Sequence, residues 1–187
     1  RDGKYIDCSG LSFRDFMAGK LSTLPGEKPA MDDFDDHIST IFPEVRLKTF
    51  LEMRGADTGP QARLCALSAF WTGILYDSAA LDGAWELVKS WTAGEREAMR
   101  RTVPAIGLRT PIRNTDLQAV AKDVLKLVRA GLKRRKKLSA SGEDETIFLR
   151  ELDEIADSGQ SLAERLLAKY HGEWKRDLSR AFAEVRF

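Results

Sequence analysis

Two side chains of opposite charge, Glu52 and Arg54, stand two positions apart in a segment that alternates between apolar and polar residues. A period of two is typical of a β-strand, and it places both side chains on one face. A carboxylate is a ligand that suits Mg²⁺, and the fork of a guanidinium matches phosphate oxygens. The pair therefore suits phosphoryl transfer, which depends on positioning and on charge compensation.

The segment around this pair is predicted to be one strand over residues 44–54. Its polar face also carries Arg46 and Lys48, which would bind phosphate or a substrate carboxylate, or would simply be solvated or ion-paired. A strand with a polar face ordinarily faces solvent. Phe50 among the charges, and a glycine-containing turn over residues 55–60 where backbone can approach a ligand, favour a partly enclosed face instead. The opposite face consists of Val45, Leu47, Thr49, Leu51 and Met53.

The elements around this strand change in character at about residue 60. Residues 1–60 are expected to form strands and loops, with a short strand over 3–8 and a helix that Ser12 caps. Residues 61–187 show helical spacing, with an irregular connection marked by Pro104, Gly107 and Pro111. The expected fold class is α+β and mainly helical, with a few antiparallel strands near the N-terminus. Helices are expected from residue 61 and over about 81–91, 116–137, 146–157 and 161–170, with capping boxes at Thr92–Glu95 and Ser161–Glu164 and with Trp71, Trp85, Trp91 and Trp174 in the core.

Composition disfavours several classes of protein. Of the 187 residues, 43% are hydrophobic and 32% charged, as in ordinary globular domains. With 30 Lys and Arg against 29 Asp and Glu, the net charge is +1, so no nucleic-acid partner is expected. The basic run over 133–137 is expected to be a solvated helix end. No apolar stretch approaches the roughly 18 residues of a membrane span, so no membrane partner is expected. The cysteine content fits a reducing, cytoplasmic compartment.

Neither a zinc site nor a cysteine nucleophile is predicted. His37 and His171 have no partners at the spacing of metal ligands. Neither histidine stands in a recognisable relation to Cys8 or Cys65. Cys65 is expected to be a small buried apolar residue on a helix.

Runs such as Leu51-Glu52-Met53-Arg54-Gly55-Ala56-Asp57 and Phe42-Pro43-Glu44-Val45-Arg46-Leu47-Lys48 resemble the plant-type glutamate–cysteine ligases, or γ-glutamylcysteine synthetases, of plants and many proteobacteria. The resemblance covers nearly the whole chain and is most specific over residues 42–77. Further matching runs are residues 5–8, 13–21, 24–27, 66–71, 73–77, 103–104, 107–108, 110–111 and 172–174.

The resemblance implies ATP-dependent ligation of the glutamate γ-carboxylate to the cysteine amine through a γ-glutamyl phosphate, the first step of glutathione biosynthesis. It implies ATP and Mg²⁺ as cofactors and a glutamine-synthetase-like catalytic fold, in which a Glu-x-Arg strand supplies a Mg²⁺ ligand and a phosphate-binding arginine. Glu52 and Arg54 match that motif, and Lys48 is assigned to cofactor binding beside them. A longer polypeptide is also implied, of which this chain is the C-terminal part. The segment alone is therefore expected to lack ligase activity.

The resemblance also concerns the cysteines. In plant members, the position of Cys8 pairs in a disulfide with the position that is Thr23 here, so that bond cannot form. This departure fits a bacterial source, such as a proteobacterium. The family partner of Cys65 would lie upstream of this chain.

Two alternatives stay open. One is another carboxylate–amine ligase of the same superfamily, because the acceptor pocket is expected to come largely from upstream residues. The other is a helical binding or regulatory module without catalysis. Retention of both Glu52 and Arg54 argues against the second alternative.

Overall fold

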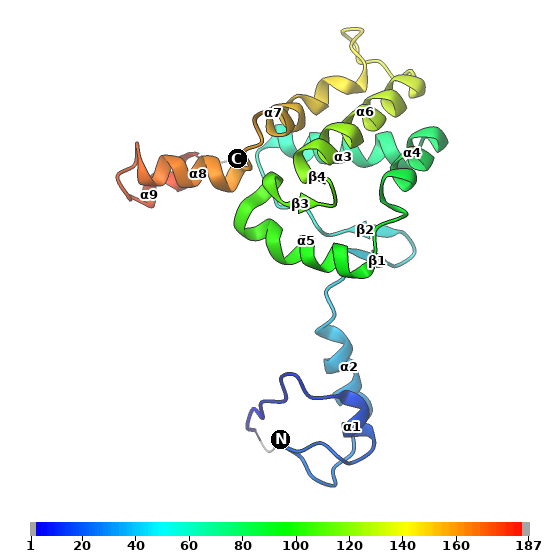
Figure 1. Ribbon diagram of the computed structural model, residues 1–187, viewed down its shortest axis with the longest axis vertical. Coiled ribbons are helices and arrows are strands. Elements are labelled where there is room, and N and C mark those ends of the chain that lie inside the picture. Colours follow the sequence, from blue (N-terminus) through cyan, green and yellow to red (C-terminus); the bar gives the residue numbers. More distant parts are fainter. Residues whose placement is uncertain (1–2, 185–187) are drawn as a thin grey trace. The chain divides into compact units, whose positions relative to one another are not determined.

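The computed structural model describes residues 3–184 (Figure 1). The chain divides between Ala56 and Asp57 into two compact units. We call them the N-terminal unit and the helical unit. The mainly helical character predicted from the sequence is confirmed. Within the described residues, the strands form two antiparallel sheets of two strands each.

The N-terminal unit contains short elements joined by turns. They are α1 (Phe13–Met17), α2 (Met31–Ser39), β1 (Val45–Leu47) and β2 (Leu51–Met53). Ser12 occupies the N-cap position of α1, as predicted, but its side chain makes no capping hydrogen bond. The strand expected over residues 3–8 is wrong: this segment is irregular, and no described strand lies beside it to take its backbone hydrogen bonds.

The helical unit is built around the contact between α3 and α6, with α4 and α7 also packed against α6 (Figure 1). The helices α3 and α6 approach closely at two glycines: a Cβ on Gly131 would lie 1.9 Å from the Gly73 carbonyl oxygen. The elements are α3 (Gln61–Leu75), α4 (Ser78–Val88), α5 (Ala93–Ile106), η1 (Gly107–Arg109), β3 (Pro111–Ile112), β4 (Thr115–Asp116), α6 (Leu117–Arg135), η2 (Glu145–Leu149), α7 (Arg150–Ser158), α8 (Leu162–His171) and α9 (Ser179–Glu184).

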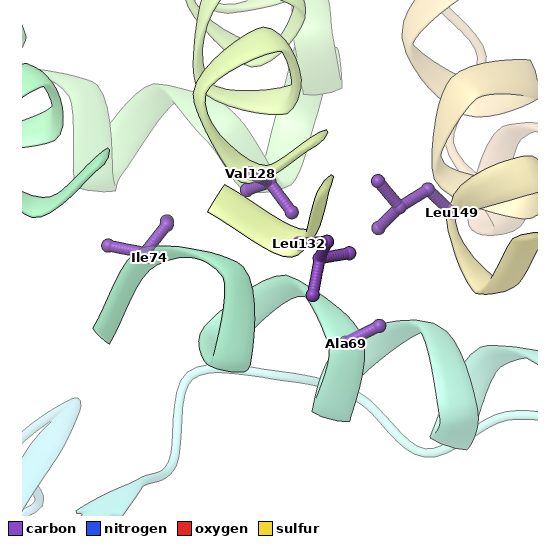
Figure 2. Close-up of a cluster of buried hydrophobic side chains, with 5 residues drawn as sticks. All are labelled: Ala69, Ile74, Val128, Leu132 and Leu149. Atoms are coloured by element: carbon purple, nitrogen blue, oxygen red, sulfur yellow. The ribbon is translucent and has the colours of Figure 1, made fainter. Parts of the chain in front are cut away.

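A cluster of buried apolar side chains fills the space between these helices (Figure 2). Val128, Leu132 and Leu149 have no measurable exposure to solvent. Ala69 and Ile74 complete the cluster from α3. Burial of this kind is the main favourable term in folding, so the cluster stabilises the helical unit.

Local signals set the helix ends of this unit. Both predicted capping boxes are confirmed: Thr92 and Ser161 each accept a hydrogen bond from the backbone N–H three residues on. The irregular connection expected at Pro104, Gly107 and Pro111 is confirmed from Gly107 onward, where η1 and the short strands β3 and β4 lead to α6. Its expected start at Pro104 is too early, because α5 continues through Pro104 to Ile106. Pro104 lies so near the helix end that little of the helix follows the interruption.

The tryptophans divide between core and surface. Trp174 is 4% exposed, in agreement with the prediction. Trp85 is 62% exposed, so its assignment to the core is wrong. It is on α4, whose contact with α6 is made through the Gly83 side, where Leu127 lies.

No single helix among residues 3–184 is long and apolar enough to cross a membrane. The helices α3 and α4 meet that test of length and composition only as a pair, and they are bent by 93° at the break between them.

Candidate functional site

The segment that carries Glu52 and Arg54 is a β-hairpin. The single strand predicted over residues 44–54 is therefore wrong: β1 and β2 are antiparallel, and the chain reverses over residues 48–50. The Lys48 N–H donates to the Phe50 carbonyl oxygen at 2.9 Å across this reversal. A backbone hydrogen bond between two parts of the segment needs a turn, which the alternation of side chains does not reveal.

The hairpin nevertheless keeps the predicted polar face in its paired region. Arg46 lies opposite Glu52, whereas Val45 pairs with Met53 and Leu47 with Leu51. Directly opposed residues of antiparallel strands point to the same side of the sheet. Each pair joins two even or two odd positions, so the polar and apolar residues stay on separate faces.

An ion pair closes the polar face. The Arg46 Nε donates to Glu52 Oε2 at 2.6 Å, with the two side chains 41% and 33% exposed, respectively. This hydrogen bond lowers the pKa of the Glu52 carboxyl, and partial burial opposes the change. The positive charges of Arg46, Arg54 and Lys48 lower it further. Glu52 is therefore held in its ionised form, which is the form that can bind a cation.

Arg54 lies one residue beyond β2. Its backbone N–H donates to the Glu44 carbonyl oxygen at 2.8 Å, which extends the pairing of the hairpin by one residue. Its guanidinium carbon lies 5.7 Å from the centre of the Phe42 ring, an attractive cation–π distance. Within the described part of the chain, the Arg54 guanidinium has no carboxylate partner, so its donors remain available to an anion.

Lys48 stands at the other end of the hairpin, in the reversal itself. Its side chain is exposed, and among residues 3–184 no ion-pair partner is found for it. Arg46, Lys48 and Arg54 therefore place three cationic groups along one hairpin, around the Glu52 carboxylate. Such a concentration of positive charge attracts phosphate or carboxylate groups.

The hairpin by itself fits a phosphate better than a bare metal ion. No group of three or more His, Cys, Asp or Glu side chains that could hold a metal is found among the described residues. Magnesium is commonly bound by one or two carboxylates together with substrate phosphates and water. Glu52 fits the part of one such ligand, provided that the phosphates arrive with the metal.

Two contacts in this region were not predicted from the sequence. The pairing of Arg46 with Glu52 follows from the turn, and opposite charges at equal distances from residue 49 are its only sequence signal. The contact of Arg54 with Phe42 joins positions twelve residues apart and has no such signal. Residues 55–60 follow the hairpin as irregular backbone, so the predicted end of the strand is confirmed, but these residues do not form a regular turn.

The two positions that the resemblance pairs in a disulfide are neighbours in space. Cys8 Sγ lies 3.3 Å from Thr23 Oγ1. Cys65 is on α3 and is half-buried, and both cysteines are free. The chain thus has the geometry of the pairing without the second thiol.

Comparison with known proteins defines the class of protein that carries this hairpin. The family model described as Glutamate-cysteine ligase family 2 (GCS2) matches residues 6–184. The chain therefore belongs to this family, and the predicted resemblance to plant-type glutamate–cysteine ligases is confirmed.

Individual relatives support the same family assignment. The chain is 52% identical to a chloroplastic glutamate–cysteine ligase of Nicotiana tabacum and 51% identical to one of Arabidopsis thaliana, each over 187 residues. It is 50% identical to glutamate–cysteine ligase A, chloroplastic, of Oryza sativa subsp. indica. All of this chain is covered in each case, but only 35%, 35% and 37% of the respective relatives. The chain thus spans about a third of the length of these relatives.

Proposed function

We propose that this chain forms part of an ATP-dependent ligase that joins the γ-carboxylate of glutamate to the amine of cysteine, the first step of glutathione biosynthesis. One observation carries the proposal. In this member of the family, the hairpin places the Glu52 carboxylate among the cationic side chains of Arg46, Lys48 and Arg54. The roles proposed for Glu52, Arg54 and Lys48 are a metal ligand, a catalytic phosphate-binding arginine and a cofactor-binding lysine, respectively.

The reaction explains why such a face is needed. A carboxylate oxygen of glutamate attacks the γ-phosphorus of ATP, the bond to the bridging oxygen breaks, and ADP leaves. Both reactants are anionic, so they repel each other unless cations lie between them. Arg54 donates to the phosphoryl oxygens as charge redistributes in the transition state, and Lys48 offsets the charge of the nucleotide. Glu52 would hold Mg²⁺, which when bound would supply further positive charge to offset the repulsion between the anionic reactants.

The second step consumes the acyl phosphate. The cysteine amine attacks the γ-carbonyl carbon, phosphate leaves with the electron pair of the broken C–O bond, and the amine loses a proton. Arg54 can remain bound to the same phosphate while it becomes the leaving group. The intermediate must be kept from water, because hydrolysis would release the phosphate without forming an amide.

We infer that residues outside this chain complete the active site. The relatives are about three times as long, and the hairpin supplies the Glu52 carboxylate and cations but is only a small part of such a protein. The segment alone is then expected to form no γ-glutamylcysteine. Formation of this product by the isolated 187 residues would contradict that expectation.

The test of the function is ADP release by the full-length polypeptide with glutamate, cysteine and Mg²⁺. Arg54→Ala and Glu52→Gln should each lower kcat/KM by roughly 10²- to 10³-fold, the effect expected for loss of a transition-state contact. Arg101→Ala is the matched control, because Arg101 forms an ion pair with Glu97 on α5, in a helix with no proposed role. Unchanged activity in both hairpin variants would overturn the proposed roles.

The amine acceptor is tested in the same assay. ADP release should require cysteine as well as glutamate. Release that fails with cysteine but occurs with another amine would assign the chain to a different carboxylate–amine ligase. The chloroplast is the location in the names of the plant relatives, and a cytoplasmic location for this chain stays a prediction, as does the bacterial source.

A further inference from the structure

Arg46 holds a position that the proposed chemistry does not explain. Glu52 is proposed to bind the metal, yet its Oε2 already accepts a hydrogen bond from the Arg46 Nε at 2.6 Å. Arg54 is turned to Phe42 instead. Among the described residues, Arg46 is thus the cation in direct contact with the carboxylate.

We propose that Arg46 is a displaceable counter-ion of Glu52: it holds the carboxylate until a metal-bound nucleotide arrives, and it then turns to an anionic oxygen of a substrate. This inference rests on the proposed function, since it assumes that Glu52 binds the metal.

The ion pair between Arg46 and Glu52 is weak enough for an incoming metal ion to displace Arg46. The two side chains are 41% and 33% exposed, so water screens their attraction. An ion pair of this exposure changes a binding constant by a factor of about two to five. That is enough to keep Glu52 from binding stray cations tightly. It is too little to resist a divalent cation that brings phosphate oxygens as additional ligands.

The fate of the released guanidinium follows from its surroundings. In the pair, only the Nε of Arg46 donates to a described residue, and its terminal nitrogens make no hydrogen bond to residues 3–184. Once Glu52 turns to the metal, Arg46 would stand unpaired beside Lys48 and Arg54. An anionic oxygen is the group that restores its charge balance and matches the planar donor fork. The oxygen could belong to a phosphate of the nucleotide or to a carboxylate of glutamate.

The experiment uses the full-length polypeptide and Mn²⁺ alone, without nucleotide, with free Mn²⁺ measured by electron paramagnetic resonance. Arg46→Met removes the competing charge, so Mn²⁺ should bind about two- to five-fold more tightly. Arg46→Lys keeps a cation opposite Glu52 and should restore the wild-type affinity. The matched control is Arg101→Met, which breaks a pair of 2.8 Å between Arg101 and Glu97 on α5 and should change nothing.

A second arm identifies the anion. At saturating metal, Arg46→Met should raise one Michaelis constant by about ten-fold, the loss expected for a hydrogen bond to a charged group. A rise in the KM for ATP would assign the oxygen to phosphate, and a rise in the KM for glutamate would assign it to a carboxylate. Both outcomes support the proposal.

The proposal is overturned if Arg46→Met leaves Mn²⁺ affinity unchanged or weaker, or if both KM values stay at the wild-type level. Glu52→Gln separates this failure from failure of the proposed function. If Glu52→Gln weakens Mn²⁺ binding but Arg46→Met does not strengthen it, the counter-ion role alone is wrong. If Glu52→Gln has no effect on Mn²⁺ binding, the metal-ligand role of Glu52 is wrong, and the counter-ion role with it.

Discussion

The N-terminal unit and the helical unit are stabilised in different ways. The helical unit buries a cluster in which Val128, Leu132 and Leu149 are fully covered. In the described part of the N-terminal unit, Phe16 and Leu21 are the buried apolar side chains, and they stay 7% and 5% exposed. The hairpin there relies on backbone pairing and on the ion pair between Arg46 and Glu52. The chemistry proposed for this family member thus stands on the less densely packed unit, and the helical unit supplies a conventional core.

The largest expected effect is on that core. Leu132→Ala should destabilise the helical unit by about 3 kcal/mol, because it removes a fully buried side chain and leaves a cavity among α3, α6 and η2. Urea denaturation followed by circular dichroism measures the change. Leu138→Ala is the control, because Leu138 lies just beyond α6 and is 67% exposed. Equal losses in the two variants would contradict the core assigned here.

A covalent bond should strengthen the N-terminal unit. Thr23→Cys brings a second thiol to an atom position 3.3 Å from Cys8 Sγ, so a disulfide should form under oxidising conditions. Closing this short loop should stabilise the unit by up to about 3 kcal/mol. Thiol titration before and after reduction tests bond formation, and Thr23→Ser is the control. Two free thiols after oxidation would show that the two side chains do not approach as described.

The ion pairs of the helical unit predict a dependence of stability on pH. Hydrogen bonds from Arg134, and then from the Ala80 N–H, lower the pKa of Asp77 from 3.8 to about 2. A carboxyl with a lowered folded-state pKa stabilises the fold above its unfolded value and loses this contribution as pH falls toward 2. Melting temperature should therefore drop between pH 4 and pH 2.

The variant Asp77→Asn isolates this contribution. Asparagine keeps an N-cap for α4 but removes the charge that Arg134 binds. The melting temperature of Asp77→Asn should fall less steeply over the same pH range. Parallel curves for the variant and the wild type would show that the Asp77–Arg134 pair has no part in acid sensitivity.

The smallest effect is expected on the apolar face of the hairpin. Leu47 is 79% exposed, so Leu47→Ala should change the free energy of unfolding by about 0.5 kcal/mol or less. The measurement is made in the full-length polypeptide, beside Leu132→Ala. A loss greater than about 1 kcal/mol would show that another part of the polypeptide covers this face and that the contrast between the units is smaller than the described residues indicate.

The sequence predicted most of the helical unit because its signals are local. Thr92 and Glu95, or Ser161 and Glu164, lie within one helical turn of each other, so their capping contacts need no other part of the chain. The connection marked by Pro104, Gly107 and Pro111 begins later than predicted, because a proline near a helix end is tolerated. The assignment of Trp85 to the core was wrong because helical spacing does not tell which face of α4 meets another helix.

For the candidate site, the sequence by itself determined which residues share a face. Side chains alternate along any strand, so Arg46 and Glu52 share a face both in the single strand that was predicted and in the hairpin that forms. Only the tertiary structure decided which residues touch. The reversal at residues 48–50 sets Arg46 against Glu52 and leaves Arg54 over Phe42. Those contacts depend on where the chain turns and on distances between separated residues, which a period of two does not contain.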